Sequence, residues 1–482
     1  MISFSTNKQQ TKLQFKCADA DIFNSIREHF SVANAGASFA RRKFRGRRIF
    51  IADRKYAITP TGQCDIGLFY ELKNYLISKQ IVSDVVVSEE LLKLLKPGCN
   101  SEIYTQFSKS LRDYQLEVVD TAIKTGWGTC VLGTGAGKTL TTAAIIENYY
   151  RNSKNQNTFK CLVIVPDLGL VSQTYDEFKD SGISFKLTQW TGKKTPDLNA
   201  NVIICNMGIL QSQFKINEWV KYVDLLIVDE AHKIRPDNKV SKIISEIKTR
   251  NRYGFTGTLP EDSYDQWFIT GKLGPVLYEK NSSELRSQNF LTNVEVKIIE
   301  LKYKSPIIVK KGENAYRSEL EYIYNNQIRN LLIAKLCNRI DNNTLILVNH
   351  IVHGEQLYEI LRTTLNKQVY FIRGEVEVAE RDRIKKIMED NNDVVCVAIS
   401  AIFSTGVNIK NIHNIMFVAG GKSFIRTVQS IGRGLRLHKN KDQLTIYDIC
   451  DDLKYSKQHS EKRKLIYDKE KINYTEKAVL LG

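Results

Sequence analysis

Short apolar runs alternate with amphipathic stretches over most of this 482-residue sequence, from Leu111 to about Asp452. Parallel strands that helices cover on both faces are apolar throughout, and two such strands need a connection of helical length between them. The alternation therefore predicts an α/β fold built on parallel sheets. The runs that we expect to form strands are 129–132, 161–165, 202–205, 225–228, 344–348, 394–399 and 415–418.

Shifts in composition divide the chain into four parts. The first hundred residues combine short alternating pieces with a helix-like segment at 67–79, which predicts a small α+β domain. The polar segment 279–293 separates two α/β halves, and the charge density rises after Asp452. We expect an accessory domain over 1–105, α/β domains over 106–280 and 281–452, and a solvated basic helical tail over 453–482.

The composition is that of a folded protein with an excess of positive charge. Lysine and arginine number 70 against 53 aspartates and glutamates, a net charge of +17. This excess indicates either a polyanionic partner such as a nucleic acid or a surface charge that keeps the protein in solution. No run approaches the roughly 18 apolar residues of a transmembrane helix. The first ten residues are polar and show no secretory signal, and the nine cysteines form no C-x-x-C pair. We expect a reducing, cytoplasmic location and no membrane.

The segment 132–139 (LGTGAGKT) follows an apolar run and precedes a helical pattern, the context of a phosphate-binding P-loop. Its glycines let backbone N–H groups turn toward phosphate oxygens at the N-terminus of the helix. Lys138 would reach the β- and γ-phosphates, and the Thr139 hydroxyl would ligate Mg²⁺. Leu132 stands where the strict pattern has glycine, and the glycines at 133, 135 and 137 still permit the cradle.

Two carboxylates follow the apolar run 225–228, in the sequence Asp229-Glu230-Ala231-His232. The carboxyl edge of a parallel sheet is where open α/β proteins bind ligands. Asp229 is suited to hold Mg²⁺, and Glu230 to orient or deprotonate an attacking water molecule. His232 would sense the γ-phosphate or link to the next motif. With the P-loop, these residues predict ATP hydrolysis.

Near the end of the second α/β half, 429–436 (QSIGRGLR) places Arg433 and Arg436 three residues apart, on one face of a helix. Guanidinium groups match phosphate geometry and stabilise the charge that develops on a transferred phosphoryl group. This spacing suits a pair of arginine fingers, and a basic helix on the protein surface would show the same spacing.

Together these motifs closely resemble the signature of superfamily 2 helicases, in the family's order from Leu111 to Asp452. The segment 111–115 (LRDYQ) is similar to the one that contacts adenine, and 404–408 (STGVN) to T-x-G-x-D, with Asn408 for the usual aspartate. The resemblance assigns catalysis to Glu230, Asp229, Lys138, Arg433, Arg436 and Gln429. It assigns nucleotide binding to Arg112, Gln115, Thr134, Gly135, Ala136, Gly137, Lys138, Thr139, Gly406 and Asn408, and Mg²⁺ binding to Thr139 and Asp229.

The same resemblance assigns residues to the nucleic acid and to coupling. Pro166 and Gln173 stand in the motif that touches the nucleic-acid backbone. Thr256, Gly257 and Thr258 match the T-G-T motif that couples hydrolysis to strand handling, together with His232. The implied architecture is two RecA-like domains with ATP and Mg²⁺ in the cleft between them. ATP that bridges Lys138 and Arg436 would then favour closure, and hydrolysis would remove that bridge.

The accessory domain contains 41–50 (RRKFRGRRIF), with six basic residues in eight positions and aromatic residues among them. This mixture suits phosphates together with stacked bases. A small module ahead of the motor and a short basic tail resemble the bacteriophage recombination helicases, which implies branched or forked DNA as substrate. We expect a monomer that works in the bacterial host cytoplasm with recombination or single-strand-binding proteins. The expected DNA contacts here are Arg41, Arg42, Lys43, Arg45, Arg47 and Arg48.

Three other functions compete with this interpretation. The chain could be the duplex-translocating subunit of a restriction or nuclease complex, although it shows no convincing nuclease motif of its own. It could be an RNA helicase, which the Asp-Glu-Ala-His motif does not exclude. A binding scaffold with an inactive ATPase is disfavoured, because Lys138, Glu230 and Arg436 are all present.

Overall fold

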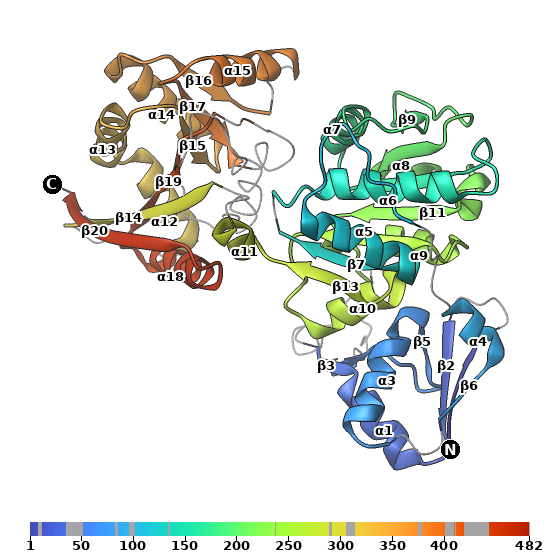
Figure 1. The fold of residues 1–482 in the computed structure, drawn as a ribbon. Helices are drawn as coiled ribbons and strands as arrows, with labels where there is room; N and C mark the ends of the chain where they lie inside the picture. The colour runs from blue at the N-terminus through green and yellow to red at the C-terminus, as the bar shows by residue number, and fades with distance from the viewer. Residues whose placement is uncertain are drawn as a thin grey trace. The chain divides into compact units, whose positions relative to one another are not determined.

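The computed structural model forms two compact units, residues 1–132 with 137–280 and residues 133–136 with 281–482 (Figure 1). Each unit contains its own seven-stranded sheet. Among the residues that the structure describes, no helix is both long and apolar enough to cross a membrane. The structure describes residues 1–7, 12–34, 52–81, 85–95, 102–133, 135–236, 238–288, 292–304, 314–374, 378–400, 409, 411–418 and 443–481.

All pairings in the sheet of the first unit are parallel, in the order β13-β7-β12-β11-β8-β10-β9. Every residue of β7 and β8 is buried, which explains why β8 is apolar throughout and β7 is apolar except at Thr129. The strands are β7 (Trp127–Leu132), β8 (Cys161–Val165), β9 (Leu187–Trp190), β10 (Val202–Asn206), β11 (Leu225–Asp229), β12 (Arg252–Thr256) and β13 (Val276–Lys280).

Helices cover both faces of this sheet. Leu162 and Ile164 of β8 share one apolar core with α8, α9 and α10, and the side chain of Val163 between them points to the opposite face. On that second face α6 packs against both α5 and α7. The helices are α5 (Asp113–Thr125), α6 (Lys138–Asn152), α7 (Leu168–Lys179), α8 (Met207–Gln213), α9 (Lys239–Glu246) and α10 (Ser263–Leu273).

The sheet of the second unit is also parallel, in the order β16-β17-β15-β18-β19-β14-β20. The predicted class, two parallel-sheet α/β domains after a small α+β region, is therefore confirmed. The strands are β14 (Asn293–Tyr303), β15 (Thr344–Val348), β16 (Val369–Ile372), β17 (Val395–Ile399), β18 (Asn414–Phe417), β19 (Gln443–Asp451) and β20 (Asn473–Leu481), and the helices are α11 (Ser282–Ser287), α12 (Ala315–Asn325), α13 (Gln327–Asn338), α14 (Ile351–Thr364), α15 (Val378–Asp390) and α18 (Lys454–Lys469).

The end of the chain differs from the expected solvated helix. The helix is present as α18, but its Arg463 and Tyr467 are buried and both bind Oδ2 of Asp448 on β19, at 2.8 and 2.9 Å. The following strand, β20, then pairs with β14. The many charged residues of this segment predict a helix in solvent. The helix packs against the domain nevertheless, because the buried carboxylate of Asp448 provides the hydrogen bonds that a buried arginine and a buried tyrosine need.

The N-terminal module is a mixed four-stranded sheet, in the order β5-β2-β1-β6, beside a two-stranded ribbon of β3 and β4. Its apolar core includes Phe4, Phe15 and Leu72. The helix-like segment 67–79 forms the short helix η1 (Ile66–Leu68) and then α3. The elements are β1 (Ile2–Thr6), β2 (Lys12–Cys17), β3 (Ser31–Ala33), β4 (Arg54–Tyr56), β5 (Gln63–Asp65), β6 (Val85–Val87), α1 (Ala20–His29), α3 (Phe69–Ser78) and α4 (Glu89–Leu94).

This module packs directly on α10, in the same compact unit. Gly67 lies so close to α10 that a Cβ atom there would stand 1.9 Å from the carbonyl oxygen of Thr270, which explains the glycine. Nζ of Lys272 contacts Oδ1 of Asp65 at 3.0 Å, and the ring of Trp267 lies 5.1 Å from that of Phe30. The N-terminal module and the first α/β domain therefore share one continuous interface.

Candidate nucleotide and nucleic-acid site

Four predicted motifs follow neighbouring strands of the first sheet. The strands β7, β12, β11 and β8 lie side by side and run parallel. Their carboxyl ends therefore meet at one edge, where an open α/β sheet binds ligands. Along that edge stand the P-loop after β7, Thr256 as the last residue of β12, Asp229 as the last residue of β11 and Pro166 after β8. Because β12 separates β7 from β11, the P-loop strand and the Asp229 strand are about 10 Å apart.

The P-loop has the backbone that a phosphate cradle requires. Gly135 and Gly137 have φ angles of +82° and +77°, a left-handed conformation that favours glycine, and α6 begins immediately afterwards at Lys138. Nζ of Lys138 donates to the carbonyl oxygen of Leu132 at 3.2 Å. The ammonium group thus lies beside its own loop, at the end of the helix that carries partial positive charge.

Gln115 holds this loop from the preceding helix. Its buried side chain accepts from the backbone N–H of Arg112 at 2.9 Å and donates from Nε2 to the carbonyl oxygen of Gly137 at 3.5 Å. A Cβ atom at Gly137 would lie 2.4 Å from that Nε2. Arg112 donates to the hydroxyl of Tyr114 at 3.0 Å. The structure therefore gives Gln115 a contact with the P-loop that sequence reasoning missed, whereas Arg112 contacts Gln115 and Tyr114.

The acidic motif lies on a strained turn. Asp229 ends β11, and Glu230 has φ and ψ angles of +50°, a conformation that costs a residue with a side chain of order 1–3 kcal/mol. Both residues are only partly buried. The Asp229 carboxylate and the Thr139 hydroxyl supply the hard oxygen ligands that Mg²⁺ prefers, so the residues present fit this ion.

His232 joins the acidic motif to the coupling motif. Its Nδ1 lies 2.9 Å from Oγ1 of Thr256 and 3.2 Å from Oε2 of Glu230. The Thr256 hydroxyl donates its hydrogen to the carbonyl oxygen of Thr258 at 2.8 Å, so it can only accept from the histidine. Nδ1 of His232 therefore bears a proton. The chain of contacts runs from Glu230 through His232 and Thr256 to Thr258, with Gly257 at the turn.

Among the described residues, the two on this edge that are predicted to bind a nucleic acid, Pro166 and Gln173, make fewer polar contacts with the other motifs than His232 does. Pro166 follows β8 directly and is half-buried. Gln173 is the sixth residue of α7, where its Nε2 donates to Oε1 of Glu177 at 2.9 Å. Its own Oε1 is buried and has no hydrogen-bond partner within the described part of the chain. Contact of either residue with a nucleic acid stays a prediction.

The remaining predicted site residues lie outside the residues that the structure describes, so their roles stay predictions. They come from the P-loop, from the two motifs of the second α/β domain and from the basic segment of the N-terminal module. They are Thr134, Gly406, Asn408, Gln429, Arg433, Arg436, Arg41, Arg42, Lys43, Arg45, Arg47 and Arg48.

Two protein-family models match the chain. The model of the type III restriction enzyme res subunit matches residues 108–261, and that of the helicase conserved C-terminal domain matches residues 325–438. The first match contains the P-loop, the acidic motif and the coupling motif, and the second contains Gln429, Arg433 and Arg436. Together the two matches span more than half of the chain.

Known proteins with similar sequences and structures include helicases and a restriction enzyme. The ATP-dependent DNA helicase uvsW of Enterobacteria phage T4 is 28% identical over 374 residues, 73% of each chain. The restriction-modification enzyme LlaBIII bound to DNA matches 85% of this chain and 34% of its own, with 15% identity and a TM-score of 0.57. Saccharomyces cerevisiae Dbp5 bound to RNA and ADP BeF3 matches 77% of this chain and 90% of its own, with 15% identity and a TM-score of 0.54.

Proposed function

Because the chain belongs to superfamily 2 of the helicases, we propose that it is an ATP-driven motor that unwinds or branch-migrates forked and branched DNA during recombination and replication-fork repair. It is an ATP-hydrolysing helicase enzyme. The observation that carries the proposal is the order of motifs along the carboxyl edge of the first sheet. The DNA substrate is supported by the phage DNA helicase relative and by the net charge of +17.

In this proposal the first α/β domain supplies the groups that handle the triphosphate. Lys138 exchanges the Leu132 carbonyl for a phosphate oxygen, because a bond between two charged groups is stronger than one to a neutral acceptor. Backbone N–H groups of the P-loop bind the neighbouring oxygens. Thr139 and Asp229 would hold Mg²⁺, which neutralises charge on the β- and γ-phosphates. Glu230 accepts the proton of the attacking water.

The contacts of His232 offer a route from the acidic motif to the coupling motif. A change in the charge around Glu230 alters how strongly the Glu230 carboxylate attracts the Nδ1 proton of His232. Thr256 binds the same proton. Thr256 ends β12, and the chain continues through Thr258 toward α10. We propose that loss of the γ-phosphate changes this series of contacts, from Glu230 through His232 to Thr256 and Thr258.

We propose that the second α/β domain completes the site. Arg433 and Arg436 would stabilise the charge that develops on the γ-phosphoryl group, with Gln429, Gly406 and Asn408 nearby. ATP that binds both domains favours a closed state, and hydrolysis releases it. Repeated closure against a bound strand would move the protein along DNA. The basic segment 41–48 would bind DNA, and the proposed setting is a monomer with recombination or single-strand-binding proteins in the cytoplasm of a bacterial host.

A duplex translocase is the second candidate, because the res-subunit model matches the first α/β domain. Such a motor would hydrolyse ATP on linear duplex without separating strands. An RNA helicase is a third, and it would respond to RNA. The three are distinguished by which nucleic acid stimulates hydrolysis and by whether strands separate.

The test measures the ATPase rate of the full chain with single-stranded, duplex, forked and Holliday-type DNA and with RNA, and strand separation in parallel. We expect forked and Holliday-type DNA to stimulate most and to be unwound or migrated. Lys138→Ala should abolish hydrolysis and retain DNA binding, whereas Lys124→Ala, at an exposed ion pair with Asp120, should change neither. Strongest stimulation by linear duplex without strand separation would favour the translocase, and strongest stimulation by RNA the RNA helicase.

A further inference from the structure

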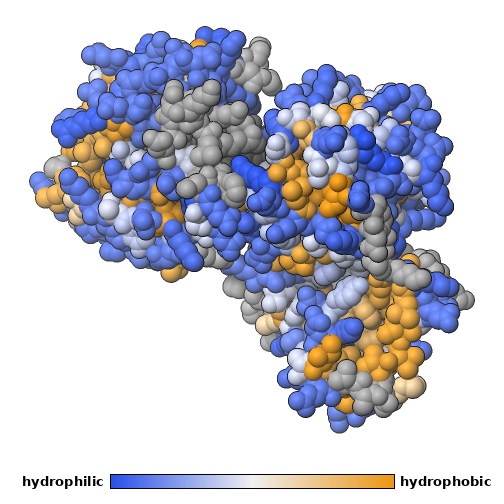
Figure 2. Space-filling model, in the orientation of Figure 1, coloured by the Kyte–Doolittle hydropathy of each residue, from blue (hydrophilic) through white to orange (hydrophobic). Residues whose placement is uncertain are grey.

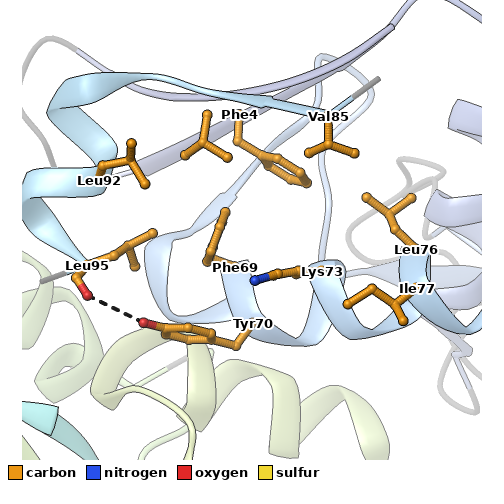
Figure 3. A pocket seen from close by; sticks show the side chains of 10 residues that line it. Phe4, Phe69, Tyr70, Lys73, Leu76, Ile77, Val85, Leu92 and Leu95 are labelled. Carbon is orange, nitrogen blue, oxygen red and sulfur yellow. Dashed lines mark hydrogen bonds between the residues drawn. The ribbon is translucent and has the colours of Figure 1, made fainter. Parts of the chain in front are cut away.

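The N-terminal module contains an apolar groove of about 480 Å³ that the helicase motifs do not use. Figure 3 shows α3 along one side, with Phe69, Tyr70 and Leu76, and Phe4 of β1 on the other. Val85 and Val87 of β6 and Leu92 of α4 complete the lining. The hydroxyl of Tyr70 donates to the carbonyl oxygen of Leu95 at 3.5 Å near one end. Grooves of this size and lining are typical of binding sites.

Large apolar side chains at this groove face solvent. Ile77 and Leu92 are 49% and 50% exposed, and Figure 2 shows a continuous hydrophobic area over the N-terminal module. The strand β6 is also the last strand of its sheet. It leaves Val86 exposed on the other face. Exposed apolar patches and open sheet edges on a folded domain commonly mark places where another chain binds.

One lysine gives the groove a charge preference. Among the described residues that line the groove, Lys73 is the charged one, and Figure 3 shows its side chain near Phe69 and Tyr70. Within the part of the chain that the structure describes, no carboxylate lies within ion-pair distance of its ammonium group. A ligand that fills the groove with apolar groups therefore gains most when it also brings a carboxylate to Lys73.

We propose that this groove binds a short amphipathic segment of a partner protein, with its apolar side chains in the groove and a carboxylate on Lys73. In the described lining, one cation stands among aliphatic and aromatic side chains. This suits such a segment better than a nucleic-acid strand, which needs several cations for its phosphates. The net charge of +17 also attracts acidic partners over a distance. This inference goes beyond the proposed helicase function and does not depend on it.

The test pans a random 12-residue peptide library against the full chain and measures the affinity of enriched peptides by fluorescence anisotropy. We expect enriched peptides to combine an acidic residue with large apolar residues. Lys73→Glu should weaken their binding about tenfold, the effect of losing one charge-assisted bond. Ile77→Glu with Leu92→Glu should abolish it. Lys16→Glu, an exposed substitution on β2, is the matched control and should leave the affinity unchanged.

The substituted positions of the groove are exposed, so the variants should fold. Two measurements check this: the variants should keep the ATPase rate and the thermal unfolding temperature of the original chain. Absence of enriched peptides would overturn the proposal. So would peptides that bind the Ile77→Glu, Leu92→Glu variant as well as the original chain. If the groove variants instead lower affinity for a single-stranded oligonucleotide, and that oligonucleotide displaces the peptides, the groove belongs to the nucleic-acid interface and the protein-binding proposal is wrong.

Discussion

At the scale of single residues, the site depends on side chains whose positions the backbone constrains. Glu230 has a left-handed conformation that residues other than glycine rarely adopt, and such strain persists only where surrounding contacts maintain it. Here the contact with His232 supplies part of that restraint. His232 in turn is bound by Thr256, which is fully buried. The conformation of one residue is therefore connected to the end of the neighbouring strand.

Replacement of Glu230 by glutamine tests its assignment as the base. Glu230→Gln keeps the shape of the side chain but removes the carboxylate that accepts a proton from water. We expect kcat for ATP to fall by about 100-fold or more, with ATP affinity retained, because general-base catalysis typically contributes 10²–10⁴-fold. Steady-state hydrolysis and nucleotide binding by fluorescence measure the two effects. Glu261→Gln, at an exposed position, is the control, and a normal rate in Glu230→Gln would refute the assignment.

At the scale of helices and strands, α10 connects two parts of the protein, the coupling motif and the N-terminal module. It follows the coupling motif in the chain, and it receives the N-terminal module through Asp65, Gly67 and Phe30. Nζ of Lys272 bonds both Asp65 at 3.0 Å and Oγ of Ser245 at 2.6 Å. Burial alone would raise the pKa of Asp65, but the charges of Lys272 and Lys12 outweigh it and lower the pKa below its usual value. The module is therefore anchored to the motor by an ion pair between the buried Lys272 and the largely buried Asp65.

Removal of the Asp65 charge should loosen this interface. Asp65→Asn leaves Lys272 buried without its counter-charge, which typically costs about 3 kcal/mol. Because the folded pKa of Asp65 is lowered, its contribution is present above pH about 4 and is lost as the pH falls further. Urea unfolding followed by tryptophan fluorescence should therefore show a difference between Asp65→Asn and the original chain at pH 7 that shrinks near pH 3.

A matched control comes from the second cation on the same carboxylate. Lys12 also pairs with Asp65, but its side chain is 38% exposed, so Lys12→Met should cost less than about 1 kcal/mol. Equal destabilisation by Lys12→Met and Asp65→Asn, or no effect of Asp65→Asn at any pH, would contradict the anchoring role of the pair between Asp65 and Lys272.

At the scale of the whole molecule, two properties matter for the proposed function: the net positive charge and the division of the chain into two units. Two units each carry a parallel sheet with its own apolar core. The net charge of +17 gives the protein a positive field that raises its rate of encounter with polyanions. If DNA binding is mainly a contact of such charges with phosphates, its salt dependence should count the lysines and arginines involved.

Substitution of Arg42, Arg45 and Arg47 by alanine should weaken DNA binding and flatten its dependence on salt. Each lost phosphate contact lowers the slope of log K against log salt by up to about 0.9 for duplex DNA. Anisotropy titrations at several salt concentrations measure that slope. The control removes three cations that already pair with carboxylates, Lys124, Arg317 and Arg362. An unchanged slope in the first variant would place the DNA contacts elsewhere.

Local sequence determined seven of the fourteen described parallel strands, and it determined the site motifs on the carboxyl edge of the first sheet. Buried strands such as β8 must be apolar on both faces, and the P-loop needs its glycines, so both features are visible in a short stretch of residues. The other seven strands were missed, namely β9, β12, β13, β14, β16, β19 and β20. In β14, for example, burial varies along the strand, which therefore lacks the uniformly apolar run that marks β8. The packed face of α18 was missed because an arginine there is buried only through Asp448.

Only the tertiary structure decided which distant residues meet. It brought Gln115 to Gly137, His232 to Thr256, and Asp65 to Lys272, pairs separated by 22 to 207 positions. It also formed the apolar groove from α3, β1, β6 and α4, none of which shows a binding motif alone. The physical reason is that periodicity and turn chemistry act over a few neighbouring residues. Contacts between separate elements depend instead on how their surfaces pack, and that is a property of the folded chain.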